Sequence, residues 1–291
     1  MDDSEHQAVF LEAAGEGNIA AMRVLLDQSD DAAGMLIYVD EEGNTAFILA
    51  ADNNNIDAIH LLLEHPSADP AEMLMLTNDD GDTAFMQIAG HGNVNAVRLL
   101  LDHPSADAAA MMLDAAHLDG RTALIWVAQD GHLDAMHLLL YHTSADPASM
   151  LMHTMDGGVT VIMMADVNGH VDAMRLLLDQ PSADPAAMMM HMDDNGKNVL
   201  MKGTENGDLD AIRLLLDHPF VDAAALMAVR GPGDISALTV AAAFAAVDDP
   251  ECSCAPLLLL LRRVSVEPSH AAQKKHMSKV MKALCRVQAD V

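Results

Sequence analysis

The chain has 291 residues, of which 51% are hydrophobic and only 3% aromatic, and it carries a formal net charge of -29 at pH 7. Its apolar residues are mostly Leu, Ala and Met, which favour helices, so the composition predicts an all-α fold. The negative charge repels phosphate backbones and anionic lipids. It therefore argues against nucleic-acid and membrane partners and favours a protein partner with a basic or neutral surface.

Cysteine content and hydropathy indicate a protein that stays inside the cell. The three cysteines, Cys252, Cys254 and Cys285, form neither a disulfide framework nor a four-ligand zinc set. The N-terminus lacks the basic region of a signal peptide, and the longest apolar run, 255–261, is far shorter than the roughly 20 residues of a membrane helix. We expect a monomer in the cytoplasm, with the nucleus as the alternative location.

The first predicted unit, residues 4–42, differs from those that follow. It lacks the G-x-T sequence that opens the later units, and its leading side is polar. Both features are typical of the end of a repeat array, so we predict an N-terminal capping repeat.

Five similar blocks follow, each opened by a glycine: 43–80, 81–119, 120–157, 158–195 and 196–233. A threonine is placed to cap a first helix in four of them (Thr45, Thr83, Thr122, Thr160). A Gly or Asn that can adopt the left-handed conformation ends this helix (Asn54, Gly92, Gly131, Gly169, Gly207). Asp or Asn opens a second helix (Asp57, Asn95, Asp134, Asp172, Asp210), which stops before a proline in most blocks. Each block therefore predicts two antiparallel helices.

A third helix is predicted after the second. Asp69-Pro70, Asp146-Pro147 and Asp184-Pro185 each combine an N-cap residue with a proline suited to the first helical position, and Asp69 with Glu72 fits a capping box. Helix formers rich in methionine come next. We expect a short third helix that replaces most of the hairpin between repeats and packs its methionines into the stack.

Two segments follow the blocks. Residues 234–263 resume the repeat pattern in degenerate form and predict a C-terminal repeat. Residues 269–289 place apolar side chains on one face and lysines on the other, which predicts a basic amphipathic helix. Because residues 262–291 hold seven of the 15 Lys and Arg but two of the 44 Asp and Glu, we expect this helix to dock on the acidic array.

The recurring G-x-T-A-L, the A-A pair late in the first helix, the G-H-x-D turn and the paired leucines resemble the ankyrin repeat over residues 4–262. The resemblance implies a helical solenoid that binds other proteins through one face. Two features depart from that family: the Pro and His after the Thr are replaced by apolar residues, and the period exceeds the usual 33 by about five residues. We predict an all-α, ankyrin-type solenoid with helix pairs plus a short third helix per repeat.

The candidate contact residues vary between repeats while the packing positions stay apolar. A row about 200° around the first helix from the buried residues Phe47, Phe85, Leu124, Ile162 and Leu200 is expected on the open face (Leu49, Gln87, Trp126, Lys202). Residues at the end of that helix lie beside this row (Asp52, Asn53, His91, Gln129, Asp130, Asn168, Glu205, Asn206). Residues of the preceding turn complete the set (Asn44, Asp79, Asp80, Asp82, Asp119, Arg121, Lys197).

The roles of Trp126 and of the turn carboxylates each have a structural explanation as well as a binding one. Trp126 either anchors a partner or fills a gap in the stack, and the turn carboxylates either select a basic partner or are there for backbone reasons. His65, His103, His142 and His218 are expected to interact with the dipole at the end of the second helix.

The sequence offers one alternative to protein binding, which is metal binding, and no recognisable motif for catalysis. Met188, Met189, Met190, His191 and Met192 resemble a soft-metal tract, so a Cu(I)-binding protein on the same scaffold is the alternative function. No nucleophile with a base, carboxylate pair or phosphate loop is recognisable in the sequence. We therefore predict a non-catalytic protein-interaction scaffold without a cofactor.

Overall fold

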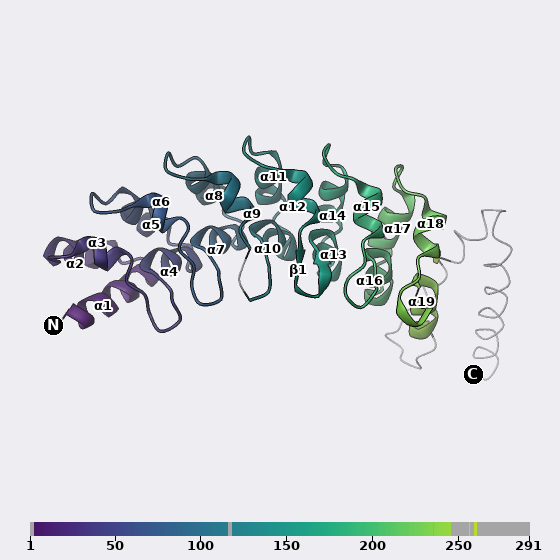
Figure 1. The fold of residues 1–291 in the computed structure, drawn as a ribbon, viewed down its shortest axis with the longest axis horizontal. Helices are drawn as coiled ribbons and strands as arrows, with labels where there is room; N and C mark the ends of the chain where they lie inside the picture. Colours follow the sequence, from purple (N-terminus) through teal and green to yellow (C-terminus); the bar gives the residue numbers. More distant parts are fainter. Residues whose placement is uncertain (1–2, 116–117, 235, 246–255, 257–258, 261–291) are drawn as a thin grey trace. The chain divides into compact units, whose positions relative to one another are not determined.

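The computed structural model describes residues 3–115, 118–234, 236–245, 256 and 259–260 (Figure 1). It forms two compact units, unit 1 (Met1–Asp156) and unit 2 (Gly157–Val291). Within the described residues, no helix is both long and apolar enough to span a membrane.

Unit 1 is built from four sets of three helices. The first helices of the sets pack side by side: α1 (Asp3–Gly15), α4 (Ala46–Asp52), α7 (Ala84–Gly90) and α10 (Ala123–Asp130). The second helices form another layer: α2 (Ile19–Gln28), α5 (Ile56–Glu64), α8 (Val94–Leu101) and α11 (Leu133–Tyr141). The third helices are α3 (Ala32–Leu36), α6 (Pro70–Met73), α9 (Ala108–Leu113) and α12 (Pro147–Met152), and strand β1 (Thr154–Met155) follows them.

Unit 2 repeats this pattern. Its first helices are α13 (Val161–Val167), α16 (Val199–Asn206) and α19 (Ala237–Ala245), its second helices α14 (Val171–Leu178) and α17 (Leu209–Asp217), and its third helices α15 (Pro185–Met190) and α18 (Ala223–Ala228). Strand β2 (Val159–Thr160) and the short 3-10 turns η1 (Asp156–Gly158) and η2 (Pro232–Asp234) complete the described elements. The predicted all-α solenoid with a third helix per repeat is confirmed.

The core has the predicted composition. The five residues expected on the inner side of the first helices are at most 1% exposed: Phe47, Phe85, Leu124, Ile162 and Leu200. Methionines of the third helices are also buried, among them Met73, Met111, Met150 and Met188. The flexible thioether side chain fills the irregular space beneath each short helix.

The helix ends follow the sequence signals only in part. The Thr45 and Thr83 hydroxyls accept hydrogen bonds from the third backbone N–H of their helices, whereas the buried hydroxyls of Thr122 and Thr160 do not cap their helices. The first helices do end in the left-handed region, as at Asn54, whose φ is 55°.

The second helices begin one residue before the Asp or Asn that was predicted to open each of them. The N-caps are Asn55, Asn93, His132, His170 and Asp208, and the residues expected to open these helices lie in the first turn. Only a side chain at the N-cap can reach the free N–H groups two and three residues ahead, as Asn93 does with Ala96 at 3.1 Å. The acidic residues of that turn lie where they favour the helix dipole, and Asp210 also pairs with Arg213 at 3.0 Å.

The histidines after the second helices lie at the predicted positions, and His65 and His142 are the C-caps of their helices. The imidazole Nδ1 of His65, His103 and His142 accepts a hydrogen bond from the backbone N–H two residues ahead, each at 3.2 Å. The Oε1 of Gln180 does the same for Ser182 at 2.8 Å. These side chains stabilise the turn after the helix as hydrogen-bond acceptors, and their interaction with the helix dipole stays a prediction.

The third helix does not replace the hairpin between repeats, contrary to the prediction. Its Asp cap works as expected, since the Asp69, Asp107, Asp146 and Asp184 carboxylates each accept a backbone hydrogen bond. A turn closed by a β-bridge nevertheless follows the third helix, at Val39–Thr45, Thr77–Thr83 and Ala115–Thr122. The added residues are therefore inserted before the turn.

The C-terminal predictions are only partly covered by the structure. The degenerate repeat at 234–263 contains α19, whose N-terminus is closed by Ser236 and Thr239: each side-chain oxygen accepts from the other residue's backbone N–H, at 2.7 and 3.2 Å. The predicted basic helix at 269–289 lies outside the described residues.

Candidate functional site

In unit 1 the predicted open-face row is half-buried. Leu49, Gln87 and Trp126 occupy equivalent places on α4, α7 and α10, and each is intermediate between buried and exposed. The residues at the ends of these helices are more accessible, since Asp52, Asn53, His91 and Asp130 are exposed and Gln129 is half-buried. The structure therefore brings these side chains to one continuous side of α4, α7 and α10.

Trp126 combines the two roles that the sequence left open. A Cβ at Gly90 would lie 3.5 Å from Trp126 Cε3, so the indole packs against the neighbouring helix α7 and fills space there. The guanidinium carbon of Arg121 lies 5.0 Å from the ring centroid, a cation–π geometry. The indole Nε1 is buried without a hydrogen-bond partner among the described residues. Trp126 is thus held in a fixed orientation with part of its ring accessible.

Carboxylates crowd the turns beside this tryptophan. Burial raises the pKa of Asp82, and the neighbouring charges of Asp119 and Asp80 raise it further, while Arg121 opposes the shift. Arg121 Nε lies 2.7 Å from Asp119 Oδ2. One guanidinium therefore serves several carboxylates, and the negative charge around Asp82 is only partly neutralised.

The turn residues divide into structural and accessible groups. Asn44 is structural: its amide donates to Asp40 at 3.1 Å and its Oδ1 accepts from Asn78 at 3.1 Å. Asp79 and Asp80 are exposed, and within the described part of the chain their carboxylates accept no hydrogen bond. The backbone explanation of turn carboxylates therefore holds for Asp40 but leaves the charge of Asp79 and Asp80 available to a partner.

Side-chain hydrogen bonds to the last turn of α4 lie at the edge of this surface. The His91 imidazole Nε2 donates to the Asp52 carbonyl and so links α7 to α4, whereas the Asn53 amide donates locally to the Leu49 carbonyl at 3.0 Å. Both bonds orient the side chains on carbonyls of the helix end.

In unit 2 the equivalent cations are neutralised by carboxylates of the same unit. Lys197 Nζ lies 2.6 Å from Glu205 Oε2, and Lys202 Nζ lies 2.7 Å from Asp193 Oδ2. Burial alone would raise the pKa of Asp193, but hydrogen bonds from Lys202 and from the Lys197 backbone outweigh it and lower the pKa. Asn168 and Asn206 are exposed beside these pairs. The lysines of this part of the predicted site are therefore already paired with carboxylates of the same unit.

Asp166 is a residue that the sequence analysis missed. It is 1% exposed, and neither carboxylate oxygen accepts a hydrogen bond from the described residues. Burial raises its pKa to about 8, Asp208 adds to the shift, and Lys202 opposes it. The signal was present in the repeat register, because Ala51, Ala89 and Ala128 occupy the same position in the preceding repeats.

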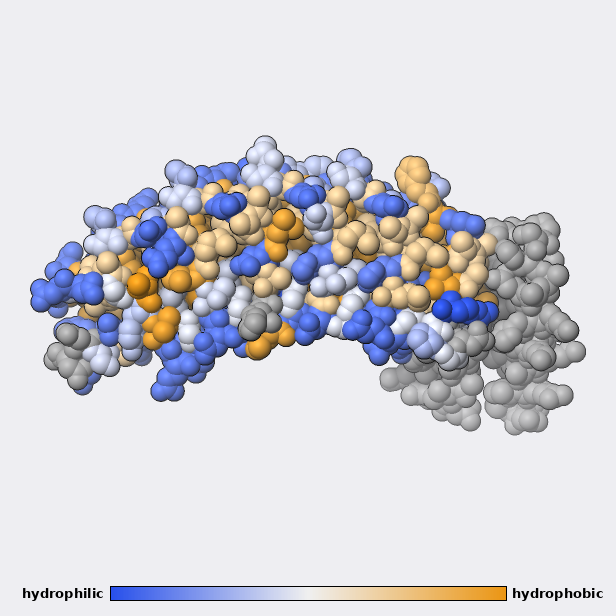
Figure 2. Space-filling view, viewed as in Figure 1, coloured by the Kyte–Doolittle hydropathy of each residue, from blue (hydrophilic) through white to orange (hydrophobic). Residues whose placement is uncertain are grey.

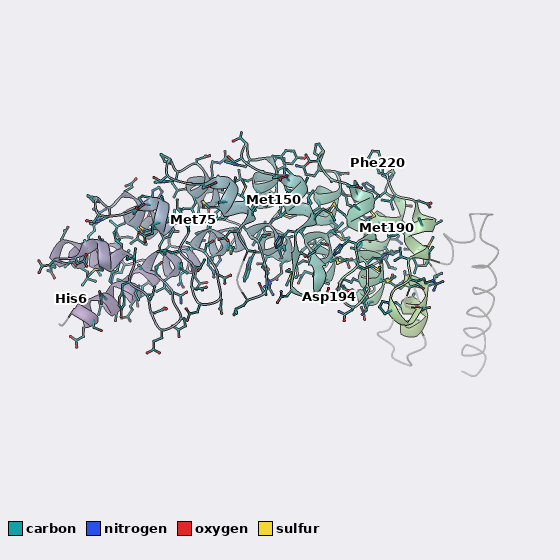
Figure 3. All side chains as sticks on the ribbon, in the orientation of Figure 1. His6, Met75, Met150, Met190, Asp194 and Phe220 are labelled. Atoms are coloured by element: carbon teal, nitrogen blue, oxygen red, sulfur yellow. The ribbon has the colours of Figure 1, made fainter. Side chains whose placement is uncertain are left out.

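The Met/His tract carries no arrangement that favours the Cu(I) alternative. Met188 and Met189 are buried in the stack, and the Nε2 of His191 donates to the Gly158 carbonyl at 2.9 Å. Unlike Met188 and Met189, Met190 is not buried and lies at the C-terminal end of α15 (Figure 3). Among the described residues, no group of three or more His, Cys, Asp or Glu is placed to hold a metal ion.

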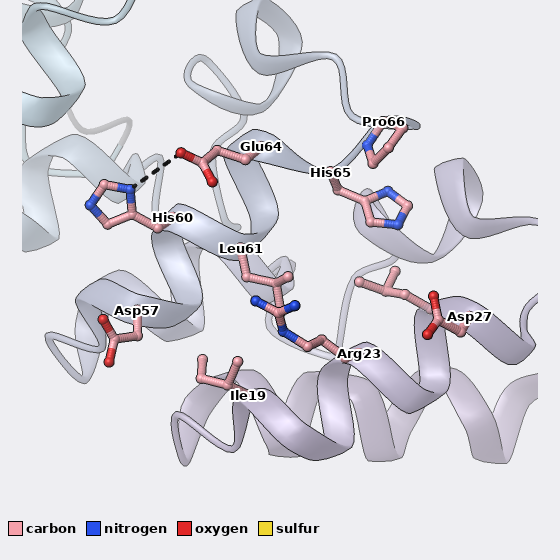
Figure 4. Close-up of a pocket in the computed structure, with 10 residues that line it drawn as sticks. Ile19, Arg23, Asp27, Asp57, His60, Leu61, Glu64, His65 and Pro66 are labelled. Carbon is pink, nitrogen blue, oxygen red and sulfur yellow. Dashed lines mark ion pairs between the residues drawn. The ribbon is translucent and has the colours of Figure 1, made fainter.

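A surface groove of about 610 Å³ lies between α2 and α5, away from the predicted residues (Figure 4). Arg23, Asp27, Asp57 and Glu64 line it, and the His60 Nδ1 lies 3.9 Å from Glu64 Oε1. This open groove of mixed charge includes none of the predicted contact residues.

Comparison with known proteins identifies the repeat. A family model described as "Ankyrin repeats (3 copies)" matches residues 1–73, 69–150 and 148–225. Among solved structures, the human ASB11 ankyrin repeat domain has a TM-score of 0.63 at 18% identity, covering 87% of this chain and 96% of that one. The ankyrin repeat domain of Bcl-3 has a TM-score of 0.62 at 18% identity, with 87% and 97% covered. No curated protein sequence matches the chain.

Proposed function

Since the chain belongs to the ankyrin-repeat family, we propose that it is a non-catalytic scaffold that binds a protein with a basic surface through the face formed by α4, α7, α10 and the turns before them. Ankyrin repeats generally mediate protein–protein interactions, and the two similar structures support the fold alone. The basic character of the partner and the position of the contact surface are inferred from the residues of unit 1.

The observation that carries the proposal is the partly neutralised charge around Asp82. Arg121 pairs with Asp119 at 2.7 Å and opposes the rise in the pKa of Asp82, which is caused first by burial and then by the charges of Asp119 and Asp80. A Lys or Arg side chain from a partner would relieve the repulsion between these carboxylates. Complementary charge of this kind speeds association and selects against acidic partners.

Trp126 supplies an anchor beside the carboxylates. A large aromatic side chain already fixed by Gly90 and Arg121 loses little conformational freedom when it is covered. Tryptophan and arginine are the residue types that most often dominate binding energy at interfaces. We therefore place the centre of the contact at Trp126, with Gln87, His91, Gln129 and Asp130 around it.

The test is affinity capture followed by identification of the bound protein. The intact chain is compared with Asp80→Asn/Asp82→Asn and with a control that removes equal charge from exposed positions of the second helices, Asp134→Asn/Asp172→Asn. We expect a partner whose capture weakens with salt, is lost with the first variant and is kept with the control. Equal capture by all three proteins would contradict the proposed site.

We further propose that the chain works as a monomer in the cytoplasm or nucleus. The described residues contain no membrane-spanning helix, and mutual repulsion of a net charge of -29 opposes self-association. Sedimentation and fluorescence imaging of a tagged chain would test the two statements.

A further inference from the structure

The third helices of unit 1 leave a row of half-exposed apolar residues at their C-terminal ends. The row consists of the residue six positions after each capping aspartate, where the third helix ends. Its members are Ile37 at 42%, Met75 at 39%, Leu113 at 40% and Met152 at 39% exposed. Figure 2 shows apolar residues gathered over α6, α9 and α12, and Figure 3 labels Met75.

This apolar row, Ile37–Met75–Leu113–Met152, is not needed to form the third helix. The two residues before each member already fill the core, as Met73 and Leu74 do at 1% exposed each. In unit 2 the equivalent positions are Met190 at the end of α15, which is 41% exposed, and Ala228 at the end of α18, which forms without a large side chain there. A large apolar residue at an exposed position in four successive repeats therefore needs another explanation than folding.

Carboxylates border the apolar row on both sides. The capping residues Asp31, Asp69, Asp107 and Asp146 precede it, each exposed and about 9 Å away along the helix. The exposed turn acids Asp79 and Asp156 follow it by four residues. The third helices of unit 1 contain no Lys or Arg to neutralise these charges. The surface is thus an apolar seam between two acidic borders.

The distance between neighbouring members of the apolar row matches the rise of two turns of an α-helix. Packed helices lie about 8 to 10 Å apart, so neighbouring members of the row are separated by about that distance. Seven residues of an α-helix rise about 10.5 Å. A helix laid along the seam would therefore present an apolar residue to every repeat if its apolar positions recurred every seven residues.

We propose that the Ile37–Met75–Leu113–Met152 row is a second docking surface, which takes an amphipathic helix with one apolar residue per seven and Lys or Arg on both flanks. The apolar residues of that helix contact the row, and its cations meet the capping and turn carboxylates. Unbranched methionines adapt to side chains of different shape. This surface contains neither Asp82 nor Trp126, although its turn border includes Asp79, which also belongs to the turns of the proposed binding face.

The test uses a designed helical peptide as the probe, about 28 residues long, with Leu at every seventh position and Lys or Arg beside each Leu. A second peptide has the same composition in scrambled order. Binding to the full chain is measured by isothermal titration calorimetry. We expect the ordered peptide to bind, with an affinity that falls as salt rises, and the scrambled peptide to bind about tenfold more weakly or not at all.

Two variants place the contact. Ile37→Gln/Met75→Gln/Leu113→Gln/Met152→Gln changes only half-exposed positions and should weaken the ordered peptide about tenfold or more. Val24→Gln/Leu133→Gln/Tyr141→Gln alters comparably exposed apolar residues of the second helices and should leave it unchanged. Circular dichroism and thermal melts confirm that both variants are folded.

Three results would overturn the proposal. The full chain could fail to bind the ordered peptide, or bind both peptides equally, which is simple charge attraction. The four-residue variant could bind as well as the intact chain. Sedimentation could show that the intact chain is a dimer which the four-residue variant converts to a monomer, which would assign the row to a second copy.

Discussion

Units 1 and 2 carry different charges at equivalent positions of the ankyrin repeat. In unit 1, Gln87 donates to Asp82 at 3.4 Å but brings no positive charge, so Arg121 alone partly neutralises that carboxylate. In unit 2, Lys202 occupies the position of Gln87 and pairs with the buried Asp193 at 2.7 Å. Two further positions differ in the same way, since unit 2 has Lys197 where unit 1 has Asp82 and the Asp193 carboxylate where unit 1 has the Asn78 amide. Unit 2 thus pairs its charges internally, whereas unit 1 has more carboxylates than cations at these positions.

The core shows the same contrast. Ala51, Ala89 and Ala128 are fully buried between the first helices of unit 1, whereas unit 2 has Asp166 at this position. A Cβ at Gly203 would lie 2.7 Å from Asp166 Oδ1, so the glycine leaves the room that the carboxyl occupies. Unit 1 has an apolar core and an exposed acidic face, while unit 2 holds a carboxyl group in its core.

The largest expected effect is on the stability of unit 2. Asp166→Ala restores the residue found in unit 1 and removes a carboxyl that must be protonated to stay buried. With a pKa of about 8 when folded and 3.8 when exposed, the carboxyl costs roughly 4 kcal/mol at pH 7. We expect the variant to unfold at a higher urea concentration. Ala128→Asp in unit 1 is the matched reverse change and should be destabilising.

The pH dependence sharpens this prediction. Because the pKa of Asp166 is raised on folding, the folded state keeps a proton that the unfolded state releases. The contribution of Asp166 to stability is therefore greatest below about pH 4, falls as the pH rises to about 8, and is constant above that. Urea unfolding of the intact chain should show this loss, and Asp166→Ala should not. An identical pH dependence in both proteins would contradict the assignment.

Exchanging the charge pattern tests the difference between the two faces. Gln87→Lys gives unit 1 the cation that unit 2 has at Lys202, and the new ammonium should pair with Asp82. We expect the affinity for a basic partner to fall about tenfold. Asn95→Lys adds the same charge at an exposed position of α8 and should have a much smaller effect. Titration calorimetry with the captured partner would distinguish the two variants.

Local signals in the sequence were enough to predict the repeat and its third helix. Asp69-Pro70 and Asp146-Pro147 specify a helix start through the cap and the fixed proline φ, which depend on neighbouring residues alone. The N-caps of the second helices, such as Asn55, were not predicted, because Asn55 and Asp57 are both plausible N-caps by residue type. The backbone conformation of the folded chain distinguishes them.

The candidate site was less predictable because its properties depend on contacts between repeats. The helical spacing placed Gln87 and Trp126 on one face, but the packing of Trp126 on Gly90 and the sharing of Arg121 arise from the stacking of α7 and α10. Asp166 could have been found by aligning the blocks, because it replaces an alanine present in three other repeats. The lack of hydrogen bonds to its carboxylate could not be predicted, because it depends on the packing of neighbouring helices.

The smallest predicted effect concerns the turns after the second helices. His103→Ala removes the Nδ1 acceptor for the Ser105 N–H and should lower stability by about 1 kcal/mol. His103→Gln should lose less, because Gln180 makes the equivalent bond at 2.8 Å. Equal losses in the two variants, measured by urea unfolding, would show that the imidazole acts through packing instead.

The fluorescence of Trp126 tests the central claim most directly, because it is the sole tryptophan of the chain. The captured partner, or a tryptophan-free fragment of it, is titrated into the intact chain, Asp80→Asn/Asp82→Asn and Asp134→Asn/Asp172→Asn. We predict a saturable change in emission whose midpoint shifts about tenfold or more in the first variant and stays unchanged in the second. Binding without a change in Trp126 emission, or with the same midpoint in all three proteins, would contradict the account.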